Sequence, residues 1–372
     1  MKKPKILLIG PTPPPYHGVA VSTQLILSSP ALQAFQIIHL DTADRRSIEN
    51  IGEFELGNIL IGLYHALQFW FILLRHRPRL IYLPISQGTG GYLRDLAFLI
   101  PARWFNLRTV AHLRGSEFDQ FYRTSHPLMQ TLIRYSLAKV RRVIVLGENL
   151  RSLFDGLVPP ERIAVIPNGT EDFTTTQQKP SETPSSTIRG IFLANLKPRK
   201  GFFTTFDAVL KALQHYPELK FSFVGDWGSQ EIRTQTLSKL QNQNTNNRRL
   251  EFLGVVTGDQ KNRLLMESDF FVFPPIEPEG HPRVILEAMA AGLPMITTPQ
   301  GAIVETVLDN QTGFLVEPGQ VDAIYEKIAY WIEHPDVMRK MGQAARERFL
   351  QHYTAERSNQ RLAALFIQVL EE

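Results

Sequence analysis

The sequence of 372 residues contains no cysteine. Without cysteine the chain cannot form a disulfide framework, a thiolate zinc site or a cysteine nucleophile, and the absence fits a reducing cytoplasm. Near the N-terminus the first apolar run covers only residues 6–9. It is too short for the core of a signal peptide and predicts a buried first strand. Nucleic-acid-binding signatures and repeats of solenoid length are also missing, which argues against both classes of protein.

Charged residues are sparse, at 20%, whereas hydrophobic residues make up 43%. This composition supports a sizeable core and, at this length, two domains. The net charge of +4 is unevenly spread, because residues 1–172 hold nineteen Lys and Arg against thirteen Asp and Glu, and residues 173–372 hold twenty-one against twenty-three. The basic first half predicts a phosphate-bearing ligand or an anionic lipid surface.

Residues 56–74 form a stretch of nineteen residues without any Asp, Glu, Lys or Arg. Such a stretch is long enough to span a bilayer. However, Asn58, His65 and Gln68 interrupt it, and a basic run follows at residues 75–77. We therefore expect a buried or interfacial helix rather than a membrane span.

Short apolar runs recur along the chain, and stretches long enough for a helix separate them. Each run is too short for a typical helix, and many contain β-branched or aromatic residues, so the runs predict strands. Strands that alternate with helices form parallel sheets in doubly wound α/β domains. The runs cover residues 6–9, 36–40, 80–83, 109–112, 143–146 and 163–166, and then 191–194, 221–224, 250–253, 270–273, 295–298 and 313–316.

A segment rich in Thr, Ser, Pro and Gln at residues 174–188 separates the two series of strands and predicts a linker. We therefore predict one Rossmann-like domain over residues 1–173 and a second over residues 189–352. Residues 353–372 are expected to form a last helix, capped by Thr354, that packs back on the first domain. Because ligands bind at the carboxyl ends of the strands in such sheets, we expect the site in a cleft between two facing domains.

The densest candidate motif lies at residues 273–294. A strand ends at its start, a loop rich in Pro and Gly follows, and a helix begins near Arg283. The N–H groups of the first helical turn suit an anion such as a diphosphate. Glu279 in the loop and Glu287 on the helix offer carboxylates that can accept hydrogen bonds from the hydroxyls of a ribose. Two glutamates eight residues apart are also common by chance, in an ordinary surface helix.

Three further places carry candidate residues. Asn195-Leu-Lys-Pro-Arg-Lys-Gly201 follows a strand and opens a helix. Basic side chains there oppose the helix dipole, which favours a ligand role for Lys200 over a structural one. His112 and Arg114 alternate to one face at the end of a first-half strand, and either residue can be structural or can touch a ligand. A Pro-rich turn that contains Gly18 follows the first strand.

The string Glu279-Gly-His-Pro-x4-Glu287-Ala-Met-Ala-Ala-Gly-Leu-Pro-Met-Ile resembles the Glu-x7-Glu signature of retaining glycosyltransferases of family 4. Members of that family have the GT-B fold, in which two Rossmann-like domains face a central cleft. The resemblance is specific in the second half of the chain and looser in the first. It extends to Gly301, Glu305 and residues 310–316, and upstream to residues 165–169, 223–226 and 252–256.

The resemblance implies that the first domain takes an acceptor and the second a nucleoside-diphosphate sugar. Glu287 would contact the ribose of this donor, Glu279 would lie near the transferred sugar, and Lys200 would neutralise the leaving diphosphate. The family's histidine that contacts the transferred sugar corresponds to His112 or Arg114. The remaining donor-binding positions that the resemblance implies are Gly18, Asn195, Val255, Val256, Gly280, His281 and Pro282.

The chain departs from the family pattern at two of these positions. Asn195 stands where the family usually has arginine, which puts part of the charge on the leaving group in doubt. Lys197 or Arg199 could compensate for it. Near the start of the chain, His17-Gly18 replaces the family's usual pair of glycines.

These residues predict a retaining glycosyltransferase that moves a sugar from a nucleoside-diphosphate sugar to an acceptor hydroxyl, in polysaccharide or glycolipid assembly. An epimerase or phosphorylase of the same fold, or a non-catalytic sugar-nucleotide-binding protein, are the alternatives. No Asp-x-Asp motif stands at a strand end, so we expect no metal and no other cofactor. The expected partners are the donor, a saccharide or lipid-linked acceptor and a membrane surface, with the protein cytoplasmic and peripheral on the membrane.

Overall fold

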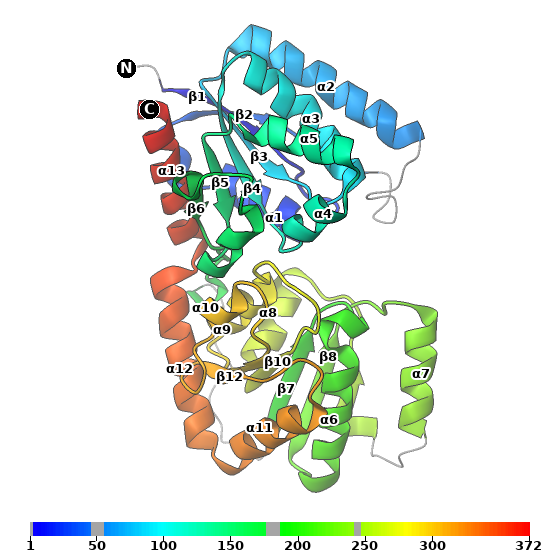
Figure 1. Cartoon of the computed structure of the whole chain (residues 1–372). Helices are drawn as coiled ribbons and strands as arrows, with labels where there is room; N and C mark the ends of the chain where they lie inside the picture. The colour runs from blue at the N-terminus through cyan, green and yellow to red at the C-terminus, as the bar shows by residue number, and fades with distance from the viewer. Residues whose placement is uncertain (1–2, 46–55, 176–186, 242–246) are drawn as a thin grey trace. The chain divides into compact units, whose positions relative to one another are not determined.

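The computed structural model of the chain describes residues 3–45, 56–175, 187–241 and 247–372. The chain divides into two compact units (Figure 1): the first comprises residues 1–169 and 355–372, and the second comprises residues 170–354. Within the described residues, each unit contains one six-stranded parallel sheet with helices packed around it. The linker predicted at residues 174–188 falls largely on residues 176–186, outside the described residues, and stays a prediction.

The first unit is built on a sheet whose strand order is β2-β1-β3-β4-β5-β6. Its strands are β1 (Lys5–Ile9), β2 (Gln36–Leu40), β3 (Leu80–Ile85), β4 (Arg108–Leu113), β5 (Arg142–Val145) and β6 (Ile163–Val165). Its helices are α1 (Gly18–Leu27), α2 (Leu56–His76), α3 (Thr89–Trp104), α4 (Phe118–Thr124), α5 (Pro127–Leu137) and α13 (Ala355–Glu371), with 3-10 turns η1 (Pro30–Leu32), η2 (Glu148–Phe154) and η3 (Pro160–Arg162). Helices on both faces bury the sheet, which is why its strands are continuous apolar runs in the sequence.

The second unit repeats this plan with the strand order β12-β11-β10-β7-β8-β9. Its strands are β7 (Ile188–Leu193), β8 (Leu219–Val224), β9 (Leu250–Phe252), β10 (Phe270–Phe273), β11 (Met295–Thr297) and β12 (Gly313–Leu315). Its helices are α6 (Phe202–His215), α7 (Gln230–Gln241), α8 (Gly258–Met266), α9 (Arg283–Ala290), α10 (Ile303–Thr306), α11 (Val321–Glu333) and α12 (Pro335–His352), with 3-10 turns η4 (Phe173–Thr175), η5 (Pro198–Lys200) and η6 (Asn247–Arg249).

All twelve runs predicted as strands are strands in the structure, with bounds that differ by at most three residues. The α/β class is therefore confirmed. The last helix, expected over residues 353–372, is α13, and it begins at Ala355. Residues 353 and 354 separate it from α12, and the carbonyl of Tyr353 accepts a hydrogen bond from the N–H of Thr170 at 3.1 Å.

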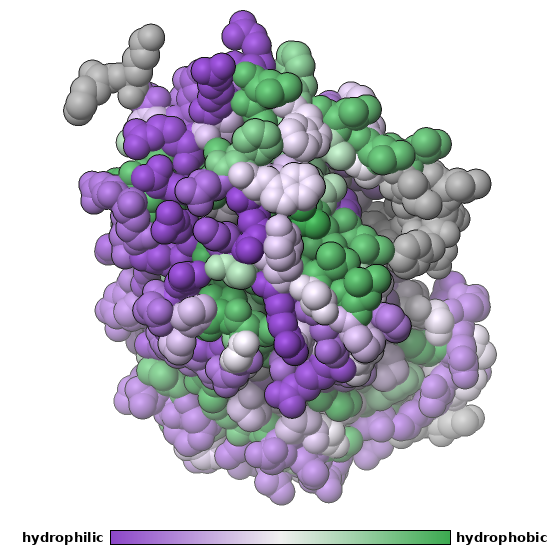
Figure 2. All heavy atoms as spheres, turned by 45° about the horizontal axis from the view of Figure 1, so that its top comes forward, coloured by the Kyte–Doolittle hydropathy of each residue, from purple (hydrophilic) through white to green (hydrophobic). Residues whose placement is uncertain are grey.

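The apolar stretch at residues 56–74 is helical, as predicted, and forms most of α2. Figure 2 shows hydrophobic side chains gathered over the face of the molecule on which this helix lies. Among the helices that the structure describes, none combines the length and hydropathy needed to cross a bilayer.

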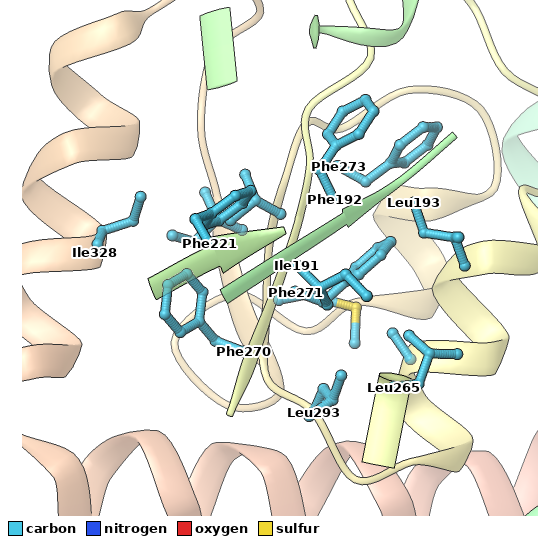
Figure 3. Close-up of a cluster of buried hydrophobic side chains, with 14 of the residues drawn as sticks. Ile191, Phe192, Leu193, Phe221, Leu265, Phe270, Phe271, Phe273, Leu293 and Ile328 are labelled. Carbon is cyan, nitrogen blue, oxygen red and sulfur yellow. The ribbon is translucent and has the colours of Figure 1, made fainter. Parts of the chain in front are cut away.

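Aromatic side chains make up much of the core of the second unit (Figure 3). Phe221 and Phe270 lie at one end of the sheet with their ring centroids 6.1 Å apart. Phe192 and Phe273, 6.2 Å apart, lie at the carboxyl ends of β7 and β10. Large buried rings contribute strongly to packing energy. These rings therefore stabilise the sheet along its whole length, as far as the loops at its carboxyl end.

The last helix, α13, packs its apolar face on the first unit. Leu362, Phe366 and Val369 are buried in the same hydrophobic cluster as residues of β1 and β3. The ring of Phe366 lies 5.7 Å from that of Tyr82 and 5.9 Å from that of Phe35. The chain therefore returns to the first unit after crossing the whole second unit.

The loops that follow β10 and β11 touch each other backbone to backbone. Gly301, after β11, has a φ of +51°, and a Cβ atom placed on it would lie 1.6 Å from the carbonyl oxygen of Glu279. The N–H of Ala302 donates to the carbonyl of Gly280 at 2.8 Å. Only glycine accommodates both this conformation and this approach, so residue 301 determines where the loop that carries Glu279 lies.

Residues 170–173, which we placed in the first domain, lie in the second unit. The carboxylate of Asp172 accepts a hydrogen bond from Nη2 of Arg346 at 2.7 Å, and Arg346 also donates to the carbonyl of Ala290 at 3.0 Å. Burial alone would raise the pKa of Asp172, but the hydrogen bonds from Arg346 and Thr174 outweigh burial and hold this pKa below its ordinary value of 3.8. The segment after Gly169 is thus tied to the end of α9.

We expect Gly301→Ala to lower the free energy of unfolding by about 3 kcal/mol, because the added Cβ overlaps a backbone oxygen that cannot move without shifting the loop. Gly319→Ala is the matched control, since Gly319 also has a positive φ, +81°, but open space around its Cβ position. The control should lose only about 1 kcal/mol, the cost of the left-handed conformation. Chemical denaturation measures both. Equal losses in the two variants would mean that the backbone contact is not the constraint.

Asp172→Asn should lower the free energy of unfolding at pH 7 by about 1–2 kcal/mol, since it weakens the charge-assisted bonds to Arg346. A carboxylate whose folded-state pKa is depressed stabilises the fold above its unfolded-state pKa and loses that effect as the pH falls through the folded-state pKa. The difference between wild type and variant should therefore shrink below about pH 4. Denaturation curves between pH 7 and pH 3 test this, and a constant difference would contradict it.

Candidate active site

Two elements of the second unit bring a lysine to the first predicted glutamate. Lys200 ends the 3-10 turn η5, after β7, and Glu279 lies in the loop after β10, the strand that pairs with β7. Nζ of Lys200 forms an ion pair with Oε1 of Glu279, and it lies 5.9 Å from the ring centroid of Phe273. Both side chains are largely buried. The structure therefore joins two of the predicted residues in one charged pair.

The second glutamate has a partner that we did not predict. Glu287, in the middle of α9, is buried, and its Oε1 lies 2.8 Å from Nζ of Lys261 on α8. A buried carboxylate needs such a partner, because removing a lone charge from water is costly. Lys261 lies in a helix that follows the strand-end loop of β9. Its place in the first turns of that helix was the only sequence signal that could have identified it.

Backbone and hydroxyl contacts fix the path of the chain between these glutamates. The hydroxyls of Thr297 and Thr298 donate to the carbonyls of Phe273 and Pro275, each at 2.6 Å. They hold the start of the loop against the end of β11. The loop then reaches the N-terminus of α9 through Gly280, His281 and Pro282, where N–H groups and the helix dipole favour an anion.

His281 is buried and acts as a neutral hydrogen-bond donor. The hydroxyl of Thr306 donates to the carbonyl of Ala302 at 2.6 Å, so its oxygen accepts the proton on Nε2 of His281, 3.0 Å away. Burial, together with the nearby charge of Arg283, lowers the pKa of His281 to about 3. Its buried side chain ties the loop to α10 through Thr306, so only its backbone groups could contact a ligand.

The other predicted positions of the second unit are more exposed. Asn195, Lys197 and Arg199 are exposed at the end of β7, and the side chain of Arg199 lies 3.4 Å from that of Glu277. Val255 is exposed beyond the end of β9, and Val256 is half-buried. These residues lie at the carboxyl ends of strands, where ligands bind in such sheets.

In the first unit, His112 and Arg114 share one hydrogen-bonded network with Tyr82. Nη2 of Arg114 donates to the Tyr82 hydroxyl at 2.9 Å, so this hydroxyl donates its own proton to Nδ1 of His112 at 2.8 Å. Nη1 of Arg114 donates to Oδ1 of Asn168 at 2.6 Å. His112 is buried, and burial followed by the charge of Arg114 lowers its pKa well below 6.5. His112 is therefore a buried, neutral residue bonded to Tyr82, whereas Arg114 is half-buried just after the end of β4.

Gly18 is the first residue of α1, and its Cβ position is open. The helix is capped by Nδ1 of His17, which accepts the N–H of Ala20 at 3.4 Å. The local geometry is thus that of a capped helix start, and the role of Gly18 in binding stays a prediction.

Sequence reasoning missed Lys261 and Tyr82, the residues that pair with or link the predicted ones. Within the described residues, no three His, Asp or Glu side chains gather in a way that could hold a metal ion. The predicted glutamates instead each pair with a lysine, Glu279 with Lys200 and Glu287 with Lys261. Such a set can bind a diphosphate through its cations and sugar hydroxyls through its carboxylates.

Residues 173–348 match the family described as glycosyl transferases group 1. The chain is 29% identical over 217 residues to WcaL of Salmonella typhimurium, which is named for glycosyl transfer in colanic acid biosynthesis; the match covers 56% of this chain and 51% of WcaL. It is 27% identical over 274 residues to the N-acetyl-alpha-D-glucosaminyl L-malate synthase of Bacillus anthracis, with 72% of this chain and 69% of that protein covered. The chain thus spans about half the length of WcaL.

Among solved structures, the chain resembles Alr3699/HepE of Anabaena in complex with UDP, with a TM-score of 0.72 and 19% identity over 98% of this chain and 100% of that one. Together with the two doubly wound sheets, this likeness shows that the chain has the GT-B fold, with a second unit that matches the glycosyl transferases group 1 family over nearly its whole length.

Proposed function

We propose that the protein is a retaining glycosyltransferase that moves a sugar from a nucleoside-diphosphate sugar to an acceptor hydroxyl, in polysaccharide or glycolipid assembly. The family match of the second unit supports the activity, and so do relatives named for glycosyl transfer. The Anabaena protein was solved with UDP, so UDP is the first nucleotide to test.

One observation carries the proposal: two lysine–glutamate pairs, Lys200–Glu279 and Lys261–Glu287, lie at the carboxyl ends of the second sheet around the N-terminus of α9. Breaking the anomeric C–O bond builds positive charge on the sugar and negative charge on the leaving diphosphate. In this proposal Lys200 and the helix N-terminus stabilise that negative charge. Electrostatic stabilisation of this kind is usually the largest single contribution to catalysis. Glu287 is the residue that we assign to the ribose.

In this mechanism the acceptor oxygen forms the new bond to the anomeric carbon on the face that the diphosphate leaves. The acceptor proton passes to a leaving phosphate oxygen, so that no protein base is required. Of the two candidates in the first unit, we assign contact with the transferred sugar to Arg114, because His112 is buried and bonded to Tyr82 whereas Arg114 is half-buried. His112 and Tyr82 then serve to position Arg114.

We propose further that the reaction needs no divalent metal, since Lys200 supplies a fixed cation for the diphosphate. Exposed Asn195 leaves one charge fewer than the family pattern provides, and this favours a non-catalytic nucleotide-binding protein as the second candidate. Incubating the protein with nucleotide sugars and saccharide or lipid acceptors distinguishes a transferase from a non-catalytic nucleotide-binding protein. A transferase releases nucleoside diphosphate only when acceptor is present, and it does so equally in EDTA. Tight nucleotide binding without release would favour the second candidate.

Glu287→Gln should weaken UDP binding about 10- to 100-fold, because a carboxylate that accepts two ribose hydroxyls is replaced by an amide. Calorimetric titration of UDP measures the effect, after a thermal-shift screen of UDP, GDP and ADP has shown which nucleotide stabilises the protein. Glu277→Gln is the control, since Glu277 lies in the neighbouring loop but is exposed and paired with Arg199. Similar losses in both variants would argue against the ribose assignment.

Lys200→Met should weaken the binding of the diphosphate at least tenfold and leave the binding of the nucleoside nearly unchanged, since only the diphosphate carries the charge that Lys200 meets. The measurement is the ratio of affinities for UDP and uridine. Lys211→Met, an exposed lysine on α6 that pairs with Asp322, is the control and should keep the wild-type ratio. An unchanged ratio in Lys200→Met would remove this lysine from the site.

A further inference from the structure

Helix α2 presents an apolar face to solvent. From Leu60 to Leu74 its exposed side chains are 57 to 70% exposed, and every one of them is aliphatic or aromatic. An ordinary surface helix has charged and polar residues at these positions. The exposed side chains are those of Leu60, Leu63, Tyr64, Leu67, Phe71 and Leu74.

The opposite face of α2 is fixed against the protein. His65, Phe69 and Leu73 are buried, and the ring of Phe69 lies 5.2 Å from that of Phe98 on α3. The helix cannot turn its exposed side chains inward without exposing these residues. Its outer face is therefore a stable surface of the folded protein.

The end of α3 extends this apolar surface. Phe105, just after α3, is exposed, and its ring lies 5.6 Å from that of Trp70 on α2. Trp104 is also exposed, and its indole N–H donates to the hydroxyl of Tyr135 at 3.2 Å. We call these two residues and the six exposed side chains of α2 the α2 face. A contiguous apolar patch of this kind on a folded protein marks an interaction site.

Positive charge lies beside the α2 face, at the C-terminal ends of α2 and α3. Between residues 56 and 106 the chain contains five arginines and one acidic residue, Asp95, which is buried. Arg75, Arg77 and Arg79 follow the apolar stripe directly, are exposed, and form no ion pair with a described residue. The guanidinium of Arg103 lies over the ring of Tyr135. Between residues 56 and 106 the apolar patch is thus bordered by cations, and the single carboxylate of this range is buried.

We propose that the α2 face docks on the surface of an anionic lipid bilayer, with α2 lying in the plane of the interface. Its aliphatic and aromatic side chains would enter the boundary between headgroups and acyl chains, where tyrosine and tryptophan are favoured. Arg75, Arg77 and Arg79 would meet the anionic headgroups. This binding involves none of the residues assigned to donor or acceptor, so it stands or falls independently of the proposed function.

A second copy of the chain is the competing occupant, because Leu60, Tyr64, Leu67, Phe71 and Leu74 repeat with coiled-coil spacing. The charges favour the bilayer. Stable helix pairs carry complementary charges beside the apolar seam, whereas two copies of the α2 face would bring arginines near arginines, and the one carboxylate between residues 56 and 106, Asp95, is buried. An anionic surface satisfies the same arginines.

Flotation of the whole protein with vesicles of phosphatidylcholine and phosphatidylglycerol at 3:1 tests the proposal. Wild type should bind these vesicles at least tenfold more tightly than Leu67→Ser/Phe71→Ser does, and its binding should weaken with salt. Arg75→Gln/Arg77→Gln should lose the preference for anionic over pure phosphatidylcholine vesicles. Leu237→Ser/Leu350→Ser, which changes two exposed leucines of the second unit, should bind as wild type does.

Circular dichroism melting and UDP titration show that each variant is folded. If the serine variant does not fold, the arginine variant still decides, because it leaves the apolar residues in place. The proposal is overturned if the wild type does not bind anionic vesicles. It is equally overturned if Leu237→Ser/Leu350→Ser loses as much vesicle binding as Leu67→Ser/Phe71→Ser does. It is also overturned if sedimentation shows a dimer that Leu67→Ser/Phe71→Ser dissociates while vesicle binding is absent.

Discussion

The candidate site depends on the close backbone contact between the loops after β10 and β11. Glu279 lies on a loop that the β-sheet alone does not position, because the strand below it ends at Phe273. The loop is held because Gly301 lets another backbone approach the Glu279 carbonyl, and because two threonine hydroxyls anchor its first residues. The ion pair between Glu279 and Lys200 therefore depends on that contact, because it fixes the loop from which Glu279 reaches the lysine.

The two ion pairs follow from the same arrangement. A loop that carries a carboxylate towards a helix N-terminus would place unpaired charge in a poorly solvated position, and each lysine removes that cost. A bound diphosphate and ribose would offer the same groups new partners: phosphate oxygens for Lys200 and hydroxyls for Glu287. The pairing also explains why Lys261 accompanies Glu287 although the motif does not contain this lysine.

The sequence was sufficient to predict the fold, because fully buried parallel strands are continuous apolar runs whose positions need no tertiary information. Its local motifs also predict a ligand role for Glu279, Glu287 and Lys200, which stays a prediction. It could not reveal Lys261 or Tyr82, which matter only through contacts between separate elements. The sequence pattern could not tell whether His112 or Arg114 is the more accessible residue. The burial of His112 depends on Tyr82 of β3, which in turn packs on Phe366 from the far end of the chain.

In helix α2 the structure differs from what the sequence pattern suggests. The helix is apolar nearly all round, which is typical of a helix surrounded by protein. In the structure, however, only one of its sides is buried. The enclosed side holds His65, whereas every exposed side chain from Leu60 to Leu74 is aliphatic or aromatic. Packing on α3 and β2 therefore leaves a large apolar area in contact with water, and water disfavours such an area. The arginines beside this area favour an anionic lipid bilayer as its binding partner, because a bilayer is apolar inside and negatively charged at its surface.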